Sequence, residues 1–227
     1  MNLAVIGSGG REHAICFKLH KSKRLKKLIC IPGNPGTGKI AKNINVDISN
    51  FDKVYKVIKE NDIDIVVIGP EQPLVDGIVD YLEERLIKVI GPNKFASQLE
   101  GSKAFMKNLC KKNNIPTAKY GVFTNLKEAE GFISENGAPI VVKADGLAAG
   151  KGVSICKNVD EAKIKTKEIL DGKFKSSRKV ILEEFLEGEE LSYFILADKN
   201  SYSFFGSAQD HKKVGEGDTG PNTGGMG

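Results

Sequence analysis

The segment VVKADGLAAGKGV, residues 141–153, is the most informative part of the chain for its architecture. It joins two apolar runs with strand character, PIVVKA (139–144) and VSIC (153–156), so the glycine-rich loop connects strand to strand. Glycines let backbone amides fold over a polyphosphate, while Lys143 and Lys151 add positive charge. The segment therefore predicts a phosphate-binding hairpin, since a plain turn has no need of glycines, alanines and lysines together.

A second segment, GNPGTGKI (33–40), nearly matches the P-loop pattern G-x-x-x-x-G-K-[ST]. Ile40 stands where that pattern needs a hydroxyl for Mg²⁺, and the following AKNINVDI (41–48) is a poor start for the long helix that caps a P-loop. Pro32 and Pro35 fit turn geometry. We interpret the segment as a structural or substrate-lining turn and not as the nucleotide site.

A third glycine-rich segment, GSGGRE (7–12), follows the first apolar run and opens a helical segment. The N-terminus of a helix is positively polarised and suits an anion. As a dinucleotide fingerprint the segment fails, because Glu12 replaces the third glycine and Pro32-Gly33 occupies the place of the ribose-binding acid. A phosphate-facing loop and a purely structural turn both remain open at this point.

The first 95 residues alternate between apolar runs and segments with helical spacing. The runs are 3–7, 28–31, 64–69 and 87–91, and the helical segments are 11–21, 52–60 and 74–85. Continuous apolar strands between amphipathic helices are typical of a parallel sheet covered on both faces. We therefore predict a doubly wound α/β domain over residues 1–95.

The order of predicted helices and strands changes after this domain. A helical stretch at 94–114 leads to helices at 125–136 and 158–170 and to strands at 139–144, 153–156, 179–185, 191–198 and 201–208. This order predicts an α+β unit with an antiparallel sheet. The glycine-dense stretch GEGDTGPNTGGMG (215–227) predicts a loop, and we expect the chain to be a fragment that stops inside it.

Composition narrows the class of protein. The net charge is +5 with 28% charged residues, and the densest basic cluster, Lys18–Lys27, has the look of a solvated helix end. The four cysteines are scattered without a metal-ligand spacing, which favours idle thiols. No apolar run is long enough to span a membrane, and no signal peptide is evident. We expect a cytoplasmic protein with neither a membrane nor a nucleic-acid partner.

Downstream of the loop, ILEEFLEGEELS (181–192) has the form of an adenine-binding hinge, and with the loop it resembles the ATP-grasp superfamily. Within that superfamily the whole chain is similar to the phosphoribosylamine–glycine ligase (glycinamide ribonucleotide synthetase) family. The motifs that carry the resemblance are GSGGREHA (7–14), PGNPGT (32–37), GPEQPLVDG (69–77), LEGSKAF (99–105), KADGLAAGKGV (143–153), SAQDHKKVG (207–215) and DTGPNTGGMG (218–227).

The resemblance implies a reaction. ATP, glycine and 5-phosphoribosylamine would give glycinamide ribonucleotide, ADP and phosphate through a glycyl phosphate intermediate. It also implies use of Mg²⁺ or Mn²⁺ and a monomer or, alternatively, a dimer. The competing readings are another ATP-grasp ligase or carboxylase and an inactive ATP-binding fragment, while an oxidoreductase would need the dinucleotide fingerprint that is missing.

The resemblance divides the chain into a substrate domain (1–95), a helical connector (96–120), an ATP-grasp lid (121–190) and the start of a truncated ATP-grasp core (191–227). It implies ATP contacts from Lys103 and Lys143, from the lid loop Gly146, Leu147, Ala148, Ala149, Gly150, Lys151 and Gly152, and from Glu183, Glu184, Phe185, Leu186 and Glu190. In this set Glu183 orders the hinge, and Glu190 meets the ribose hydroxyls.

For the sugar phosphate, the resemblance implies contacts from Gly9, Gly10, Arg11, Glu12 and Glu71. It implies that the glycine and acyl-phosphate region is lined by Asp210, Asp218, Asn222, Thr223 and Gly224. We expect His13 to be a helix residue with a local partner, and His211 is only a secondary candidate. No metal ligand is expected within the chain, because the family's acid and Asn ligands belong beyond residue 227, and the fragment alone should not turn over.

Overall fold

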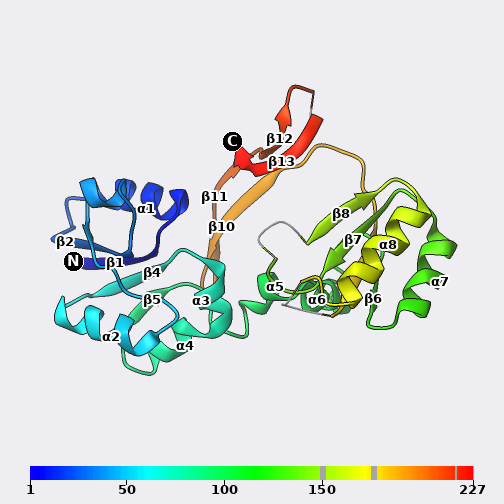
Figure 1. Cartoon of the computed structure of the whole chain (residues 1–227). Helices are drawn as coiled ribbons and strands as arrows, with labels where there is room; N and C mark the ends of the chain where they lie inside the picture. Colours follow the sequence, from blue (N-terminus) through cyan, green and yellow to red (C-terminus); the bar gives the residue numbers. More distant parts are fainter. Residues whose placement is uncertain (149–151, 175–177, 218, 227) are drawn as a thin grey trace.

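The computed structural model describes residues 1–148, 152–174, 178–217 and 219–226 (Figure 1). Its first part has the elements β1 (Asn2–Gly7), α1 (Gly10–His20), β2 (Lys27–Pro32), a 3₁₀ turn η1 (Thr37–Lys39), β3 (Lys42–Asn43), α2 (Phe51–Glu60), β4 (Ile65–Ile68), α3 (Glu71–Asp76), α4 (Ile78–Glu83) and β5 (Lys88–Ile90). The strands form one sheet in the order β3-β2-β1-β4-β5, and all four pairings are parallel.

Side chains alternate across this sheet and bury both of its faces. Along β1, Ala4 and Ile6 pack toward α2 and α4, whereas Leu3 and Val5 pack with Cys16 of α1. All five side chains are fully or almost fully buried. Because helices cover both faces, the strands have no polar face, as the continuous apolar runs predicted. The doubly wound α/β domain is confirmed.

The prediction of one continuous helix over 74–85 was wrong. Gly77 has a left-handed backbone (φ 101°), so it ends α3 and starts α4 in a new direction. Glycine adopts this conformation without the steric penalty of a Cβ atom. The apolar spacing runs through both helices, so periodicity alone hid the break.

The helical stretch predicted at 94–114 is also divided, into α5 (Gln98–Gly101) and α6 (Lys103–Lys112). Ser102 between them is extended (φ −142°, ψ 111°), and its hydroxyl accepts the backbone N–H of Phe105 at 3.1 Å. Serine is a favoured N-cap because its oxygen satisfies an amide that the first turn leaves free. The helix therefore restarts at Lys103, beside the candidate nucleotide site.

A second unit follows, which we call the lid subdomain after the role that the resemblance implies; that role stays a prediction. Its elements are β6 (Tyr120–Phe123), α7 (Leu126–Asn136), β7 (Ile140–Ala144), β8 (Val153–Cys156), α8 (Val159–Leu170) and β9 (Val180–Glu184). Its sheet has the order β6-β9-β7-β8, with antiparallel pairing throughout, as predicted. Both helices lie against one face of the sheet, and each begins at an asparagine N-cap, Asn125 and Asn158. The edge strand β6 was not predicted, because YGVF is short and contains glycine.

The remaining chain forms two separate two-stranded ribbons, β10 (Ser192–Ala197) with β11 (Tyr202–Ala208) and β12 (His211–Gly215) with β13 (Thr219–Met226). They rise between the two larger units in Figure 1. The prediction of a loop at 215–227 was wrong for β13, because backbone pairing with β12 makes a strand of a glycine-rich sequence despite its low strand propensity. In the part of the chain that the structure describes, no helix is long and apolar enough to cross a membrane.

Candidate active site

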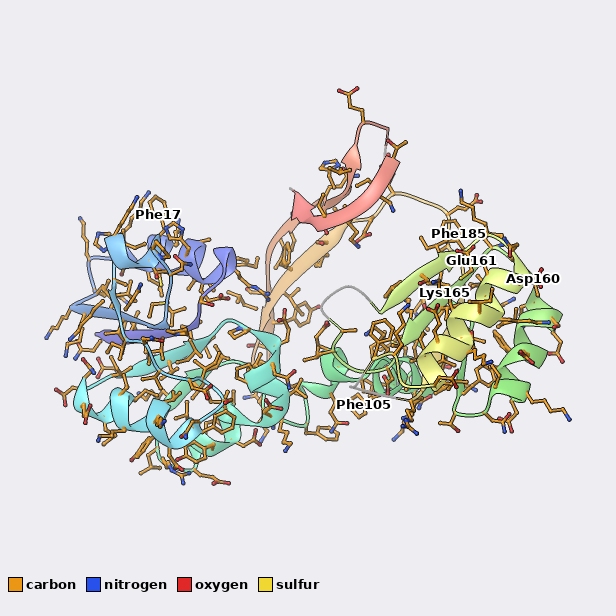
Figure 2. All side chains as sticks on the ribbon, in the orientation of Figure 1. Phe17, Phe105, Asp160, Glu161, Lys165 and Phe185 are labelled. Atoms are coloured by element: carbon orange, nitrogen blue, oxygen red, sulfur yellow. The ribbon has the colours of Figure 1, made fainter. Side chains whose placement is uncertain are left out.

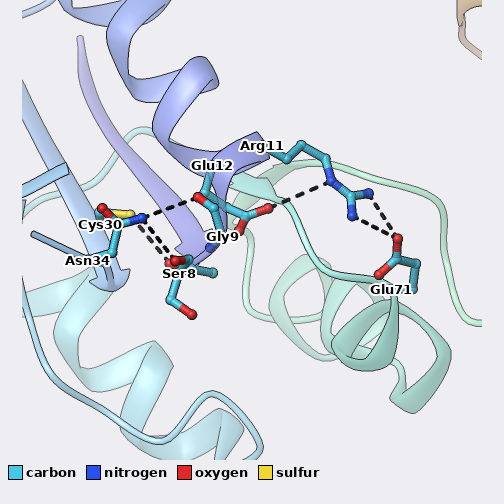
Figure 3. Close-up of polar contacts among 8 residues, drawn as sticks. Ser8, Gly9, Arg11, Glu12, Cys30, Asn34 and Glu71 are labelled. Carbon is cyan, nitrogen blue, oxygen red and sulfur yellow. Dashed lines mark hydrogen bonds and ion pairs between the residues drawn. The ribbon is translucent and has the colours of Figure 1, made fainter. Parts of the chain in front are cut away.

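The loop after β1 is shaped around a buried carboxylate. Glu12 is only 4% exposed, and its Oε2 accepts the backbone N–H of Gly9 at 2.5 Å (Figure 3). A Cβ atom on Gly7 would lie 2.6 Å from Glu12 Cγ, and one on Gly9 would lie 3.0 Å from its Oε2. Glu12 therefore fills the space that the glycines leave open and holds the first turn of α1.

Arg11, the residue before Glu12, extends outward to a second element. Both terminal nitrogens of its guanidinium donate to Glu71 Oε1 at 2.9 Å, and Glu71 is the first residue of α3. Partial burial opposes the charge of Glu71, but its own backbone N–H and Arg11 outweigh this and hold the pKa of Glu71 below its usual value. The two predicted substrate residues thus form one ion pair, and they lie on the helices that follow β1 and β4.

The segment 33–40 lies beside the 7–12 loop and has no P-loop geometry. Asn34 Nδ2 donates to the carbonyl oxygens of Ser8 and Gly9 at 2.9 and 3.2 Å. The Thr37 hydroxyl is buried and hydrogen-bonded to Asn34 and Asn43, so it stabilises the turn and is not open to a ligand. The segment contains only the three-residue η1 and is followed by the short strand β3, where a P-loop would lead into a long helix. The structure thus supports the interpretation of a turn that braces the 7–12 loop.

α6, which precedes the lid subdomain, holds the root of the glycine-rich loop. Lys103 Nζ donates to the carbonyl oxygen of Gly146 at 2.9 Å. The neighbouring Asp145 is 6% exposed and accepts the Ser102 hydroxyl at 3.1 Å and the Ala104 N–H at 3.2 Å. A carboxylate at a helix N-terminus interacts favourably with the free amides there. The loop root is therefore fixed to the start of α6.

A buried charge cluster lies across the sheet from the lid helices. Glu183 is 4% exposed, and its Oε2 is 2.9 Å from Lys143 Nζ and 3.0 Å from Lys107 Nζ. Its other oxygen, Oε1, is buried and has no hydrogen-bond partner among the described residues. We call these three residues the Glu183 cluster. Two ammonium groups and one carboxylate leave it with a net positive charge, which suits an anionic ligand.

Strand geometry separates the two hinge glutamates. Successive side chains of β9 point to opposite faces of the sheet, so Glu183 faces the cluster and Glu184 faces the lid helices. Glu184 Oε1 accepts the N–H of Lys119 at 2.8 Å and lines a cavity of about 150 Å³ against α7. The hinge residues that follow, Phe185 and Leu186, are exposed, and Figure 2 shows Phe185 at the edge of the lid subdomain.

Glu190 lies just before β10, and the predicted residues of the last segment lie on the ribbons or in the turn between them. Glu190 forms an ion pair with Lys212 Nζ at 2.6 Å, and the Thr223 hydroxyl donates to the carbonyl oxygen of Lys212 at 3.2 Å. Asp210 is half-buried in the turn between β11 and β12. The predicted roles of these residues toward the nucleotide and the glycine stay predictions.

Several predicted residues lie outside what the structure describes. Ala149, Gly150, Lys151 and Asp218 are among them, and Asn222 and Gly224 are described only as backbone of β13. Within the described ranges, no group of three or more His, Cys, Asp and Glu could hold a metal ion.

All four cysteines are free, and burial raises the pKa of Cys156 to about 11.

Sequence reasoning missed two residues that the structure places at the centre of this region. Lys107 is buried in the Glu183 cluster, and Asp145 fixes the loop root. Asp145 lies inside the quoted loop motif, so its position was a usable signal. Lys107 offered none, because a lysine on a helix that also carries Lys111 and Lys112 predicts a solvated face.

Comparison with known proteins agrees with this architecture. The family model described as "Phosphoribosylglycinamide synthetase, N domain" matches residues 1–100, and the model described as "Phosphoribosylglycinamide synthetase, ATP-grasp (A) domain" matches residues 101–227. The chain belongs to the phosphoribosylglycinamide synthetase family. The resemblance predicted from the motifs is thereby confirmed, as is the succession of a parallel-sheet domain and an ATP-grasp domain.

Among phosphoribosylglycinamide synthetase relatives, the phosphoribosylamine–glycine ligases of Mesorhizobium japonicum and Brucella melitensis are 51% and 50% identical to this chain over its full length. These matches cover 54% and 53% of the relatives. The chain therefore spans about half the length of the curated relatives it matches.

Solved structures give the same picture. The phosphoribosylamine–glycine ligase of Thermotoga maritima superposes on the whole chain with a TM-score of 0.85 at 34% identity and is itself covered to 54%. The biotin carboxylase domain of a Hydrogenobacter thermophilus 2-oxoglutarate carboxylase, solved with MgADP, has a TM-score of 0.73 at 21% identity, over 91% of this chain and 49% of its own. At that identity the second match shows the fold alone.

Proposed function

We propose that the protein is an ATP-dependent ligase that joins glycine to 5-phosphoribosylamine and produces glycinamide ribonucleotide, ADP and phosphate in purine synthesis. The observation that carries the proposal is the 51% identity to a phosphoribosylamine–glycine ligase along the entire chain, across both candidate sites. Because that match covers 54% of the relative, the activity is assigned to the protein as its gene encodes it.

The nucleotide belongs at the loop root and the Glu183 cluster. Lys143 is 26% exposed and, among the described residues, donates to Glu183 alone, so its ammonium is available to a phosphate oxygen. Lys103 lies at the loop root and would turn from the carbonyl oxygen of Gly146 to the phosphates. Because the Glu184 N–H already donates to Lys119, the adenine edge falls to the backbone of Phe185 and Leu186. Glu190 remains our candidate for the ribose, in exchange for Lys212.

The sugar phosphate belongs at the Gly9–Glu12 turn. Gly9 and Gly10 lie at the N-terminus of α1, where amides and the helix dipole favour an anion. The Arg11 side chain is 60% exposed, so its guanidinium can bind phosphate while Glu71 accepts from a ribose hydroxyl or the amine. Glu12 supports this turn from below and does not itself need to touch the ligand.

The chemistry requires no protein nucleophile. The carboxylate of glycine attacks the γ-phosphorus of ATP and releases ADP, and the amine of 5-phosphoribosylamine then displaces phosphate from the acyl carbon and loses a proton. The protein positions the reactants, offsets phosphate charge and excludes water from the acyl phosphate. Bound Mg²⁺ or Mn²⁺ would neutralise further phosphate charge. Asp210, Asp218, Asn222, Thr223 and Gly224 are the proposed lining of the glycine region.

The test measures ADP release by the protein as encoded by its gene, with Mg²⁺, glycine and freshly generated 5-phosphoribosylamine. Each substrate is omitted in turn. Release that needs both substrates is the expected result. Release without 5-phosphoribosylamine would favour another ATP-grasp ligase or carboxylase, and no release from folded protein would favour an inactive ATP-binding protein. Sedimentation of the same sample tests whether it is a monomer, as we expect, or a dimer.

A further inference from the structure

Lys107 is a buried cation whose hydrogen bonds are all internal. Its side chain is 3% exposed, and its Nζ lies 3.0 Å from Glu183 Oε2, 2.8 Å from the Thr117 hydroxyl and 3.4 Å from the carbonyl oxygen of Ala118. Two of its three N–H donors are thus used by Thr117 and Ala118, and Glu183 pairs with its charge. Because the side chain is also 3% exposed, Lys107 is enclosed by the protein and not open to a ligand, although it lies beside the proposed nucleotide site.

Lys143 has the opposite properties. It shares the same oxygen, Glu183 Oε2, at 2.9 Å, but its side chain is 26% exposed and Glu183 is its one acceptor in the part of the chain that the structure describes. Of the two lysines, Lys143 is the one that can turn to a ligand. Such a turn would leave Glu183 without this counter-charge, and a buried unpaired carboxylate is costly.

We infer that Lys107 is a positioning residue that neutralises Glu183 permanently, so that Lys143 can leave the carboxylate and bind the phosphates of the nucleotide. The inference rests on the proposed nucleotide binding. Without Lys107, Lys143 would be the sole partner of a buried carboxylate and would remain on it. With Lys107, the Glu183 cluster keeps one positive charge to offer.

One helix, α6, carries both a lysine that contacts the glycine-rich loop and the lysine that neutralises Glu183. Lys103 and Lys107 are four residues apart in α6 and so lie on the same face. Lys103 reaches the loop root at Gly146, and Lys107 reaches β9 at Glu183. α6 thus connects the glycine-rich loop and the hinge through two cations, one partly exposed and one enclosed.

The test compares Lys107→Met with Lys112→Met, a matched change at an exposed position of the same helix. Binding of a non-hydrolysable ATP analogue, ADP and adenosine is measured by calorimetry with the protein as its gene encodes it. We expect Lys107→Met to weaken the ATP analogue about 10- to 100-fold, the worth of one charge-assisted hydrogen bond. Adenosine, which has no phosphate, should bind wild type and variant alike, and Lys112→Met should match wild type throughout.

A second variant separates charge balance from fold. In Lys107→Met/Glu183→Gln no buried carboxylate holds Lys143, so polyphosphate binding should recover toward wild type. This variant also serves if Lys107→Met alone fails to fold, because it leaves no unpaired buried charge. Equal loss of adenosine and ATP analogue, or a double variant weaker than the single one, would overturn the positioning role. A wild-type protein that binds no ATP analogue would instead overturn the proposed function, and the inference with it.

Discussion

Two glutamates, Glu12 in the parallel-sheet domain and Glu183 in the lid subdomain, are equally buried but stabilised by different means. Each is 4% exposed beside a proposed ligand. Glu12 is enclosed by glycines and accepts one backbone N–H, whereas Glu183 is held by two lysines. In the first site, glycines without side chains leave the space that Glu12 fills. In the second site, positive lysines neutralise a negative glutamate. We therefore expect the first to be sensitive to added volume and the second to lost charge.

The largest effect should come from removing the carboxylate of the Glu183 cluster. Glu183→Ala leaves Lys107 buried with an unpaired charge, which typically costs about 3–5 kcal/mol of the free energy of unfolding. Urea denaturation followed by circular dichroism measures it. The matched control is Glu184→Ala on the opposite face, whose carboxylate accepts one amide at an exposed position, and whose cost should be about 1 kcal/mol. Equal losses from the two variants would contradict the difference that we draw between these faces.

A somewhat smaller effect should come from adding a methyl group next to Glu12. Gly7 has φ 126°, and a Cβ atom there would meet Glu12 Cγ at 2.6 Å. Strain and overpacking together predict a loss of about 2–4 kcal/mol for Gly7→Ala. Thermal unfolding provides the measurement. Gly10→Ala is the control, since no atom of the described residues lies within 4 Å of its Cβ position, and that variant should unfold no more easily than wild type.

The smallest effect concerns the exposed ion pair of Arg11 and Glu71. The pKa of Glu71 is lowered in the folded state, so its contribution to stability is present above its unfolded pKa, near 4.5, and is lost as the pH falls through the lower folded value. Glu71→Gln should therefore flatten the fall in stability between about pH 5 and pH 3 by less than about 1 kcal/mol. Arg11→Ala should flatten it too. A pH dependence identical to wild type in both variants would show that the pair contributes nothing.

The parts of the fold that sequence could predict are those that local pattern specifies. The strands at 3–7, 28–31 and 64–69 are β-branched apolar runs, and they appear within one residue or so of the predicted bounds. The break at Gly77 was not predictable from the same pattern, because apolar spacing continues across it. β13 was missed because its partner strand, and not its own composition, makes it a strand.

The candidate site shows the same division. Lys103, Lys143 and the hinge glutamates were found through motifs, and their predicted ligand contacts stay predictions. Lys107 was not found, because its burial depends on Glu183, a residue distant in sequence whose side chain meets it only in the folded lid. Long-range charge pairing leaves no mark on hydrophobic periodicity, so a buried lysine cannot be told from a solvated one by spacing.

Because Glu183 and Glu184 point to opposite faces of the lid strand β9, the face that each side chain reaches depends on the number of residues that precede it in the strand. One residue inserted between Val180 and Leu182 would exchange the faces of Glu183 and Glu184 and turn Leu182 out of the core beneath the lid helices, although the composition would barely change. Two inserted residues would restore the alternation. We therefore expect insertions and deletions in β9 to be tolerated only when they add or remove an even number of residues. No single substitution would reveal this constraint.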